Sequence, residues 1–465
     1  MYTTQKAPLS KTQLGIYAES MSFQESTLYN LPFLGVLGAD ICIERLKDAI
    51  EKACLAHPGL NVRIFMDENG EIMQQISQDT FQVDVIELSD DAFAQQKDKL
   101  VRPFDLMGGP LYRFELYVTP SGNYFFQDIH HIVCDGTSLG ILSRDIRRAY
   151  DGETLEAEDW SALDIALEEK NVAESEAYIR AGKYYADLLD GRDCECLPVR
   201  DAYEKVPRQS WLIREFRLDS EVFRTLRKDI GISTTAFFTS VMGFLTAKYN
   251  YRSDSVITTI YTGRKDARTE NTVTMLIKTL PFVTDISGNP PIRDLLRKAT
   301  EDLTASRENS LYSFGEIAAE YGVTTDISFG YHGQVTDFQL MDGAEIQVER
   351  IYDKQHIEKT ALLMEISDLG GGNYQLHMGY RGDMFSKTFA ENLAAAYIHV
   401  AREFLAKEFT DDVELADTKA IAQIENFNQR EYPFDKEQTI VDLFRRQAAL
   451  RPDHDALVYL DRRYT

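Results

Sequence analysis

The chain has 465 residues, of which 44% are hydrophobic and 27% charged, and its formal net charge is −25 at pH 7. This length and ordinary composition predict a folded protein of two or three domains, and the acidic balance argues against nucleic acid as a partner because phosphates would be repelled. No apolar run approaches the length that a bilayer needs, and the N-terminal stretch MYTTQKAPLS lacks the apolar core of a signal peptide, so we expect a cytoplasmic protein without membrane contact.

The first part of the chain alternates helical patterns with strand-like runs. Ser10 is a plausible cap for the first helix, and residues 43–56 carry the apolar stripe of an amphipathic helix. Phe81, Val83 and Val85 alternate as in a half-buried strand. Helices are predicted at 9–24, 43–56, 89–100 and 139–150, and strands at 61–66, 72–76, 81–88, 112–118 and 124–131. Together they predict an α/β lobe.

The second part of the chain repeats this alternation after an acidic, irregular stretch at 151–164. A strongly apolar helix is expected at 233–249, and a hairpin is expected around the three glycines at 370–372. Further helices are predicted from 161 to about 189, after Asp219, and at 292–308 and 385–406, and strands at 211–218, 255–262, 327–331, 362–366 and 374–380. These elements predict a second lobe.

The five cysteines are scattered and odd in number, which argues against a disulfide framework and fits a reducing compartment. Cys194 and Cys196 form a single Cys-x-Cys pair, and no second pair follows at a spacing typical of zinc sites. We therefore interpret this pair as structural and expect no metal site.

The most informative stretch is residues 129–136, which joins a predicted strand to a predicted helix. If the strand continues through His130 and His131, alternation sends the two imidazoles to opposite faces, so that only one faces a cavity and the other supports it. Imidazole titrates near neutral pH and can take up and pass on a proton. Asp135 can hold the loop or orient the working ring, and Gly136 permits a sharp turn or close approach to a ligand. A lone strand histidine is usually a core residue, but this combination favours a functional site.

The pattern His130-His131-x-x-x-Asp135-Gly136 resembles the core motif of condensation domains of nonribosomal peptide synthetases, which are similar in fold to chloramphenicol acetyltransferase. Other segments resemble further motifs of that family in the same order along the chain. The matching residues are Leu9, Ser10, Gln13 and Tyr17, then His57 and Leu60, then Gly263 and Arg264, and then Thr279, Leu280 and Pro281.

Two positions depart from the family pattern. Asn61 stands where the family usually has an arginine that can pair with the motif aspartate, so either Arg63 replaces that arginine or Asp135 finds another partner. Lys278 stands where asparagine is usual, and its amine either remains solvated or places a charge near the channel.

The resemblance implies an α/β (α+β) fold, with two chloramphenicol acetyltransferase-like lobes arranged as a V-shaped pseudo-dimer around a channel. Residues 1–165 would form the N-terminal lobe with the histidine motif, and residues 166–425 the C-terminal lobe. Residues 426–465 would be a linker and the truncated start of an adenylation domain, because Asn426-Phe427-Asn428, Tyr432-Pro433 and the stretch from 439 to 459 resemble such a junction.

The resemblance also implies the reaction, which is attack of the amino group of an aminoacyl thioester on an upstream acyl or peptidyl thioester. His131 would face the reacting centre, either as a base or as a group that orients the amine, while His130, Asp135 and Gly136 support it. The resemblance places Tyr17, Thr279 and Ser328 along the substrate channel. No cofactor or metal would be bound by the domain itself, since both substrates ride on 4′-phosphopantetheine arms.

The partners implied are a donor carrier protein acting in trans or an acyl-coenzyme A, a downstream acceptor carrier protein, and an adjacent adenylation domain in cis. Arg144, Arg147 and Arg148 share one helix face. They form either a solvated face that favours the helix C-terminus or a contact for the phosphate of a carrier arm or for the acidic carrier itself.

Four alternatives are considered. A starter condensation domain would transfer a fatty acyl group from coenzyme A or an acyl carrier, and the position of Met1 just before the first motif, with no carrier upstream, favours a donor on another molecule. An epimerising relative shares the histidines but fits poorly with the adenylation-like tail, and a heterocyclising relative would carry Asp in place of His130. A non-catalytic docking module, from a different class, usually has a broken motif.

Overall fold

A computed structural model describes residues 5–158, 162–173, 175–334, 348–349, 360–429 and 436–465. The chain forms two compact units, Met1–Leu415 and Ala416–Thr465. The predicted helix start at Ser161 and the junction residues Tyr432-Pro433 lie outside the described residues. The predicted lobe boundaries at 165 and 425 stay predictions. Below, N-lobe denotes residues 5–158 and C-lobe residues 162–415.

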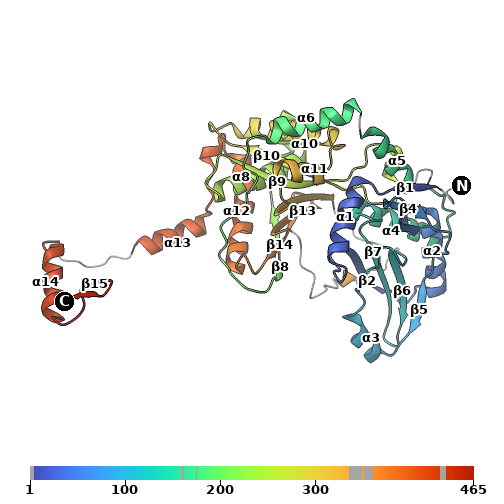
Figure 1. Cartoon of the computed structure of the whole chain (residues 1–465), viewed down its shortest axis with the longest axis horizontal. Helices are drawn as coiled ribbons and strands as arrows, with labels where there is room; N and C mark the ends of the chain where they lie inside the picture. Colours follow the sequence, from blue (N-terminus) through green and yellow to red (C-terminus); the bar gives the residue numbers. More distant parts are fainter. Residues whose placement is uncertain (1–4, 159–161, 174, 335–347, 350–359, 430–435) are drawn as a thin grey trace. The chain divides into compact units, whose positions relative to one another are not determined.

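The N-lobe is built on a five-stranded sheet in the order β12-β2-β7-β6-β5 (Figure 1). Its strands are β2 (Asn30–Leu37), β5 (Asp84–Glu87), β6 (Tyr112–Val118), β7 (Asn123–His130) and β12 (Val348–Glu349). A second, three-stranded sheet is formed by β1 (Lys6–Pro8), β4 (Ile72–Ile76) and β3 (Val62–Met66). The helices are α1 (Lys11–Ser22), α2 (Ile43–Ala56), α3 (Asp90–Lys97) and α4 (Gly136–Tyr150). The apolar faces of α2 and α4 join side chains of both sheets in one buried cluster.

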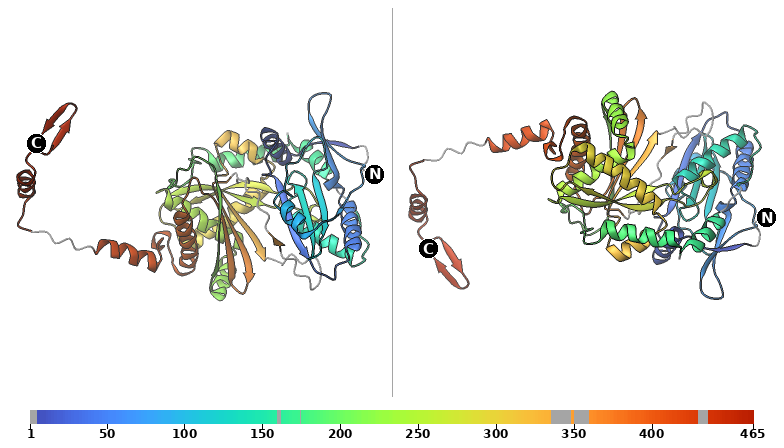
Figure 2. Two further views of the ribbon diagram at one scale, coloured as in Figure 1. Left: turned by 90° about the horizontal axis from the view of Figure 1, so that it is seen from below. Right: turned by 90° about the horizontal axis from the view of Figure 1, so that it is seen from above.

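The C-lobe is built on a six-stranded sheet in the order β10-β9-β11-β13-β14-β8 (Figure 2). Its strands are β8 (Gln209–Arg217), β9 (Asp254–Tyr261), β10 (Lys278–Asp285), β11 (Ile327–Gln334), β13 (Leu362–Gly370) and β14 (Asn373–Arg381). Its helices are α5 (Ala162–Val172), α6 (Glu176–Leu189), α7 (Ser220–Ile230), α8 (Thr234–Tyr249), α9 (Ala267–Glu270), α10 (Ile292–Glu308), α11 (Phe314–Tyr321) and α12 (Lys387–Ala406). Helix α8 is apolar on every side and is almost wholly buried between the sheet and helices α10 and α12.

Two segments of the C-lobe take part in the N-lobe. Strand β12 pairs antiparallel with β2, where Val348 lies opposite Gly35. The segment that precedes β10 contributes Val273 and Met275 to the buried core of the N-lobe. The two lobes therefore share a sheet edge and part of a core.

The second compact unit consists of α13 (Thr418–Asn428), α14 (Ile440–Leu450) and a hairpin of β15 (Leu457–Tyr459) with β16 (Arg462–Tyr464). No described residue of this unit is buried. A two-stranded hairpin and single helices without a shared core are not a domain on their own.

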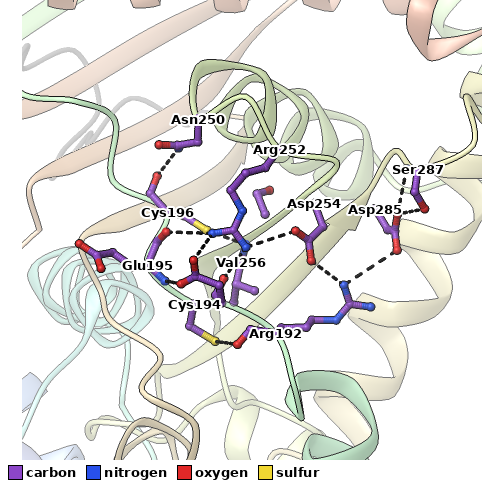
Figure 3. Close-up of polar contacts among 12 residues, drawn as sticks. Arg192, Cys194, Glu195, Cys196, Asn250, Arg252, Asp254, Val256, Asp285 and Ser287 are labelled. Carbon is purple, nitrogen blue, oxygen red and sulfur yellow. Dashed lines mark hydrogen bonds and ion pairs between the residues drawn. The ribbon is translucent and has the colours of Figure 1, made fainter.

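The cysteine pair lies in the loop that links α6 to β8, as Figure 3 shows. Both thiols are buried and free, and the Val256 N–H donates to Cys196 Sγ at 3.1 Å. Nearby, Asp254 accepts hydrogen bonds from Arg192 at 2.8 Å and from Arg252 at 3.3 Å. The loop is thus pinned to the start of β9, in keeping with a structural role for Cys194 and Cys196. Among the described residues, no group of three or more His, Cys, Asp or Glu side chains is arranged to hold a metal ion.

Most predicted elements are confirmed within a few residues, and two differences have physical reasons. The strand predicted at 81–88 is only β5, which begins at Asp84, because Phe81 and Val83 are buried in a loop and not by sheet pairing. Helix α11 was not predicted, although Ser313 and Glu316 form a capping box at its start. In the part of the chain that the structure describes, no single helix could cross a membrane. Among the described helices, only α7 and α8 taken together are long and apolar enough to do so, and a bend of 100° separates them.

Truncating Val273 tests the shared core. Its side chain is fully buried, so Val273→Ala should leave a cavity and lower the free energy of unfolding by about 2 kcal/mol. Urea unfolding measures this, with Val222→Ala, at a position 43% exposed, as the control that should change little. Equal effects of the two substitutions would show that the segment does not stabilise the N-lobe.

Candidate active site

The histidine pair lies at the end of the central strand of the N-lobe. Strand β7 ends at His130, which lies opposite Asn30 of β2. The next residue, His131, begins a turn, and its N–H donates to the Tyr29 carbonyl at 2.7 Å. Because the strand does not continue through both residues, the turn and not strand alternation sets the direction of His131. His130 is only 4% exposed and His131 is half-buried, and the expectation that His131 faces the reacting centre stays a prediction.

His130 is held as a neutral support. Its Nδ1 accepts a hydrogen bond from the Ile132 N–H at 3.2 Å, so its proton is on Nε2. The Phe104 ring packs edge-to-face against it with 5.8 Å between centroids, and the Arg113 guanidinium lies 3.7 Å from the centre of that ring. Burial, with smaller contributions from His131 and Arg113, lowers the pKa of His130 to about 3. His130 is therefore uncharged at neutral pH and adds no positive charge beside His131.

Asp135 caps helix α4 and binds the C-lobe. Its Oδ1 accepts from the Ser138 N–H at 2.8 Å, which is an N-cap bond. The Arg264 guanidinium donates to both carboxylate oxygens, at 2.8 and 3.0 Å, and the Leu276 N–H donates to Oδ2 at 3.0 Å. With its oxygens occupied by these four bonds, a fully buried Asp135 fixes the loop and is not placed to take a proton from a substrate.

These contacts decide between the two partners expected for Asp135. Arg63 bonds to Asp79 at 3.1 Å instead, near the surface. Asn61 also does not reach the motif, since its amide donates to the Asp79 carbonyl at 2.6 Å. The partner is Arg264, a residue that matched the family pattern in the sequence but was not expected at the site.

Arg264 and Ser138 bind the same short segment of the C-lobe. Arg264 donates to Ser138 Oγ at 2.9 Å and to the Thr272 carbonyl at 3.1 Å. Ser138 Oγ in turn donates to the Thr274 carbonyl at 2.8 Å and accepts a hydrogen bond from the Thr274 N–H at 3.1 Å. Gly263, immediately before the arginine, has a φ of +70°, which favours glycine. The start of α4, the motif helix, is thus hydrogen-bonded directly to residues 272–276.

Gly136 is the exposed first residue of α4, and a Cβ added to it would meet no atom within 4 Å. Its φ is not positive, so the turn itself does not require glycine. Open space surrounds this position, and close approach of a ligand to Gly136 stays a prediction.

The other residues expected along the channel lie on separate elements. Tyr17 of α1 is buried in the N-lobe core, and its hydroxyl contacts Met107 Sδ at 3.5 Å. Thr279 is half-buried on β10, and Ser328 is buried on β11. Lys278 is neither fully solvated nor free, because it donates to the Ser310 carbonyl at 2.8 Å and burial lowers its pKa.

The three arginines of α4 are engaged with carboxylates. Arg144 and Arg148 both bond to Asp145, at 2.9 and 3.2 Å, and both line a cavity of about 910 Å³. Arg147 lies 3.9 Å from Asp151. Each of the three side chains keeps part of its surface exposed.

Replacing Arg264 tests the buried ion pair. Arg264→Gln should lower the free energy of unfolding by about 3–5 kcal/mol, because the Asp135 charge is then buried without its cation. The matched change Arg63→Gln, at the pair with an exposed Asp79, should cost about 0–1 kcal/mol. Chemical denaturation of the two variants makes the comparison, and a small effect at Arg264 would show that the pair does not bind the lobes together.

Comparison with known proteins identifies the family of this chain. The family model of the condensation domain matches residues 3–440. Bacitracin synthase 3 of Bacillus licheniformis is 25% identical over 98% of this chain, which spans only 7% of that protein. The condensation domain of the monacolin K polyketide synthase MokA has a TM-score of 0.75 at 17% identity, covering 90% of this chain and 100% of that one.

The X-domain in its complex with OxyB from teicoplanin biosynthesis has a TM-score of 0.76 at 16% identity, covering 90% of this chain and 97% of that one. These structures show the fold, and they confirm the α/β class and the chloramphenicol acetyltransferase-like architecture that the motif implied. The chain belongs to the condensation-domain family, whose known activity is the formation of amide bonds.

Proposed function

We propose that this chain catalyses amide formation between a donor acyl or peptidyl thioester and the amino group of an aminoacyl thioester on a downstream carrier protein. The observation that carries the proposal is the intact motif. Its half-buried His131 follows a neutral His130, and the ion pair of Asp135 with Arg264 fixes the start of the helix that comes next.

The chemistry requires a proton to leave the attacking nitrogen as the carbon–nitrogen bond forms and the thiolate departs. His131 either accepts that proton or orients the amine and stabilises the developing charge. In both roles a neutral His130 helps, because a second positive charge next to it would oppose protonation of His131. Holding two tethered reactants together supplies much of the rate enhancement.

His131→Ala is the direct test of this role. Removal of the ring should reduce product formation by at least about 100-fold, the lower range of acid–base contributions, with unchanged thermal unfolding. Mass spectrometry of the acceptor carrier, loaded by the synthetase that contains this chain, measures the product. A variant that keeps the wild-type rate would remove His131 from the mechanism. Absence of turnover in the wild type as well would favour the docking-module alternative.

We further propose that the substrates arrive on 4′-phosphopantetheine arms and that Arg144, Arg147 and Arg148 contact the arm phosphate or the acidic carrier. The partly exposed guanidinium groups support this, since arginine suits phosphate and carboxylate partners. The protein itself would bind no further cofactor or metal, and we expect it to act in the cytoplasm.

Arg147 is suited to a test of carrier recognition, because its ion pair with Asp151 at 3.9 Å lies near the surface. Arg147→Glu should raise KM for a carrier-bound donor about tenfold, equivalent to about 1.4 kcal/mol. KM for a small soluble thioester of the same acyl group should not change. Steady-state kinetics with both donors test this, and an equal effect on both would argue against a carrier contact.

For residues 426–465 we propose a linker and the beginning of an adjacent adenylation domain. Its exposed apolar side chains, among them Ile440, Phe444 and Tyr459, support this because such groups need a partner surface.

A starter role remains the second candidate for the donor side. Parallel assays with an acyl-coenzyme A and a carrier-bound acyl donor distinguish a starter domain from an elongating one.

A further inference from the structure

His57, at the end of α2, lies between two carboxylates. Its Nδ1 is 3.1 Å from Glu158 Oε2, and its Nε2 is 3.0 Å from Asp145 Oδ2. A neutral imidazole carries one N–H, whereas an imidazolium carries two. Because both ring nitrogens face carboxylate oxygens and the residue is 3% exposed, only the protonated ring can donate to both carboxylates in their ionised form.

The two carboxylates connect His57 to both sides of the active site. Asp145 belongs to α4, the helix that the histidine motif begins. Glu158 Oε2 also accepts a hydrogen bond from the Val273 N–H at 3.1 Å. Three residues later, the Leu276 N–H binds the motif residue Asp135. One charged cluster therefore joins α2, the motif helix and the C-lobe segment.

The carboxylates differ in how much they depend on His57. Asp145 also bonds to Arg144 and Arg148. For Glu158, His57 is the cationic partner that the described residues provide. Burial raises the pKa of Glu158 although His57 lowers it. When His57 loses its proton, the carboxylate of Glu158 is left buried without a cation, which destabilises the folded state.

The two carboxylates favour the protonated form of His57. Burial alone would lower its pKa, but hydrogen bonds to Asp145 and Glu158 raise it above the ordinary value of 6.5. The ring borders the 910 Å³ cavity, which gives a path for proton exchange. The other charged residues that line this cavity are Arg144, Arg148, Glu156 and Arg268.

We propose that His57 is a positioning residue that, as an imidazolium, holds the motif helix and the segment 272–276 in register for the reaction at His131. This inference rests on the proposed function for its kinetic part. The pKa of His57 is raised by folding, so its stabilising effect is fully present below pH 6.5 and is lost as the pH rises through the raised value.

The test is a cycle of His57→Gln, Glu158→Gln and the double variant in the full chain. Urea midpoints and condensation kinetics are measured at pH 6 and pH 9. At pH 6 we expect His57→Gln to lower the midpoint and to reduce kcat about tenfold or more with KM nearly unchanged, since misplacement affects the reaction more than binding. The double variant should lose less than the sum of the single effects, because the neutral amide introduced by Glu158→Gln needs no cation.

The control is Glu156→Gln, which removes a charge from the same cavity and should leave the midpoint and kcat unchanged at both pH values. Should His57→Gln not fold, Glu158→Gln with His57 intact reports on the same link, and it should weaken the fall in stability between pH 6 and pH 9. Additive effects, or a His57→Gln variant with wild-type kcat and pH dependence, would overturn the inference. If the urea midpoints of the variants are non-additive but the wild type forms no product, the proposed function is contradicted and the structural link remains.

Discussion

The ion pair between Asp135 and Arg264 is the interaction on which the geometry of the site depends. The two residues are 129 positions apart in sequence, yet two hydrogen bonds join their side chains in a buried setting. A carboxylate that has left water is stable only when its cation and its hydrogen-bond donors stay in place. The N-terminus of the motif helix is therefore fixed by a segment of the other lobe, and the loop that presents His131 cannot change independently of residues 262–276.

Charge placement separates the histidines of the N-lobe into distinct roles. His130 faces an aromatic ring and a backbone N–H, so that burial keeps it neutral. His57 is buried to a similar degree but faces two carboxylates, which favour its charged form. The same side chain thus gives a neutral ring next to the motif and, at the end of α2, a ring held between two carboxylates. His131, at the end of the strand, is the half-buried member of the adjacent pair.

Local sequence was sufficient for features that depend on neighbouring residues. The stripe at 43–56 predicted α2 within its observed limits, Ser10 caps α1, and the glycines at 370–372 connect β13 to β14. The order of motifs along the chain was sufficient to predict the family. The helix at 314–321 could have been found from its capping box, but a short helix after an irregular stretch gives little periodic signal.

Features that depend on tertiary contacts could not be predicted from local sequence. With Asn61 in place of the usual arginine, nothing local indicates whether Asp135 pairs with Arg63 or with a residue of the other lobe. The alternation of Phe81 and Val83 predicted a strand because buried loop residues and strand residues leave the same pattern. The cluster around His57 joins three segments, and no spacing along the chain predicts it.

The measurement that tests the account most directly is single-turnover amide formation by Asp135→Asn, followed by mass spectrometry of the acceptor carrier. The amide NH₂ that replaces Oδ2 is a donor and cannot accept the hydrogen bonds from Arg264 and from the Leu276 N–H, so the loop should lose its anchor while the His131 ring remains present. We expect a rate that is lower by at least about tenfold in a protein that still folds. A folded Asp135→Asn variant that forms product at the wild-type rate would contradict the claim that this buried carboxylate positions the site.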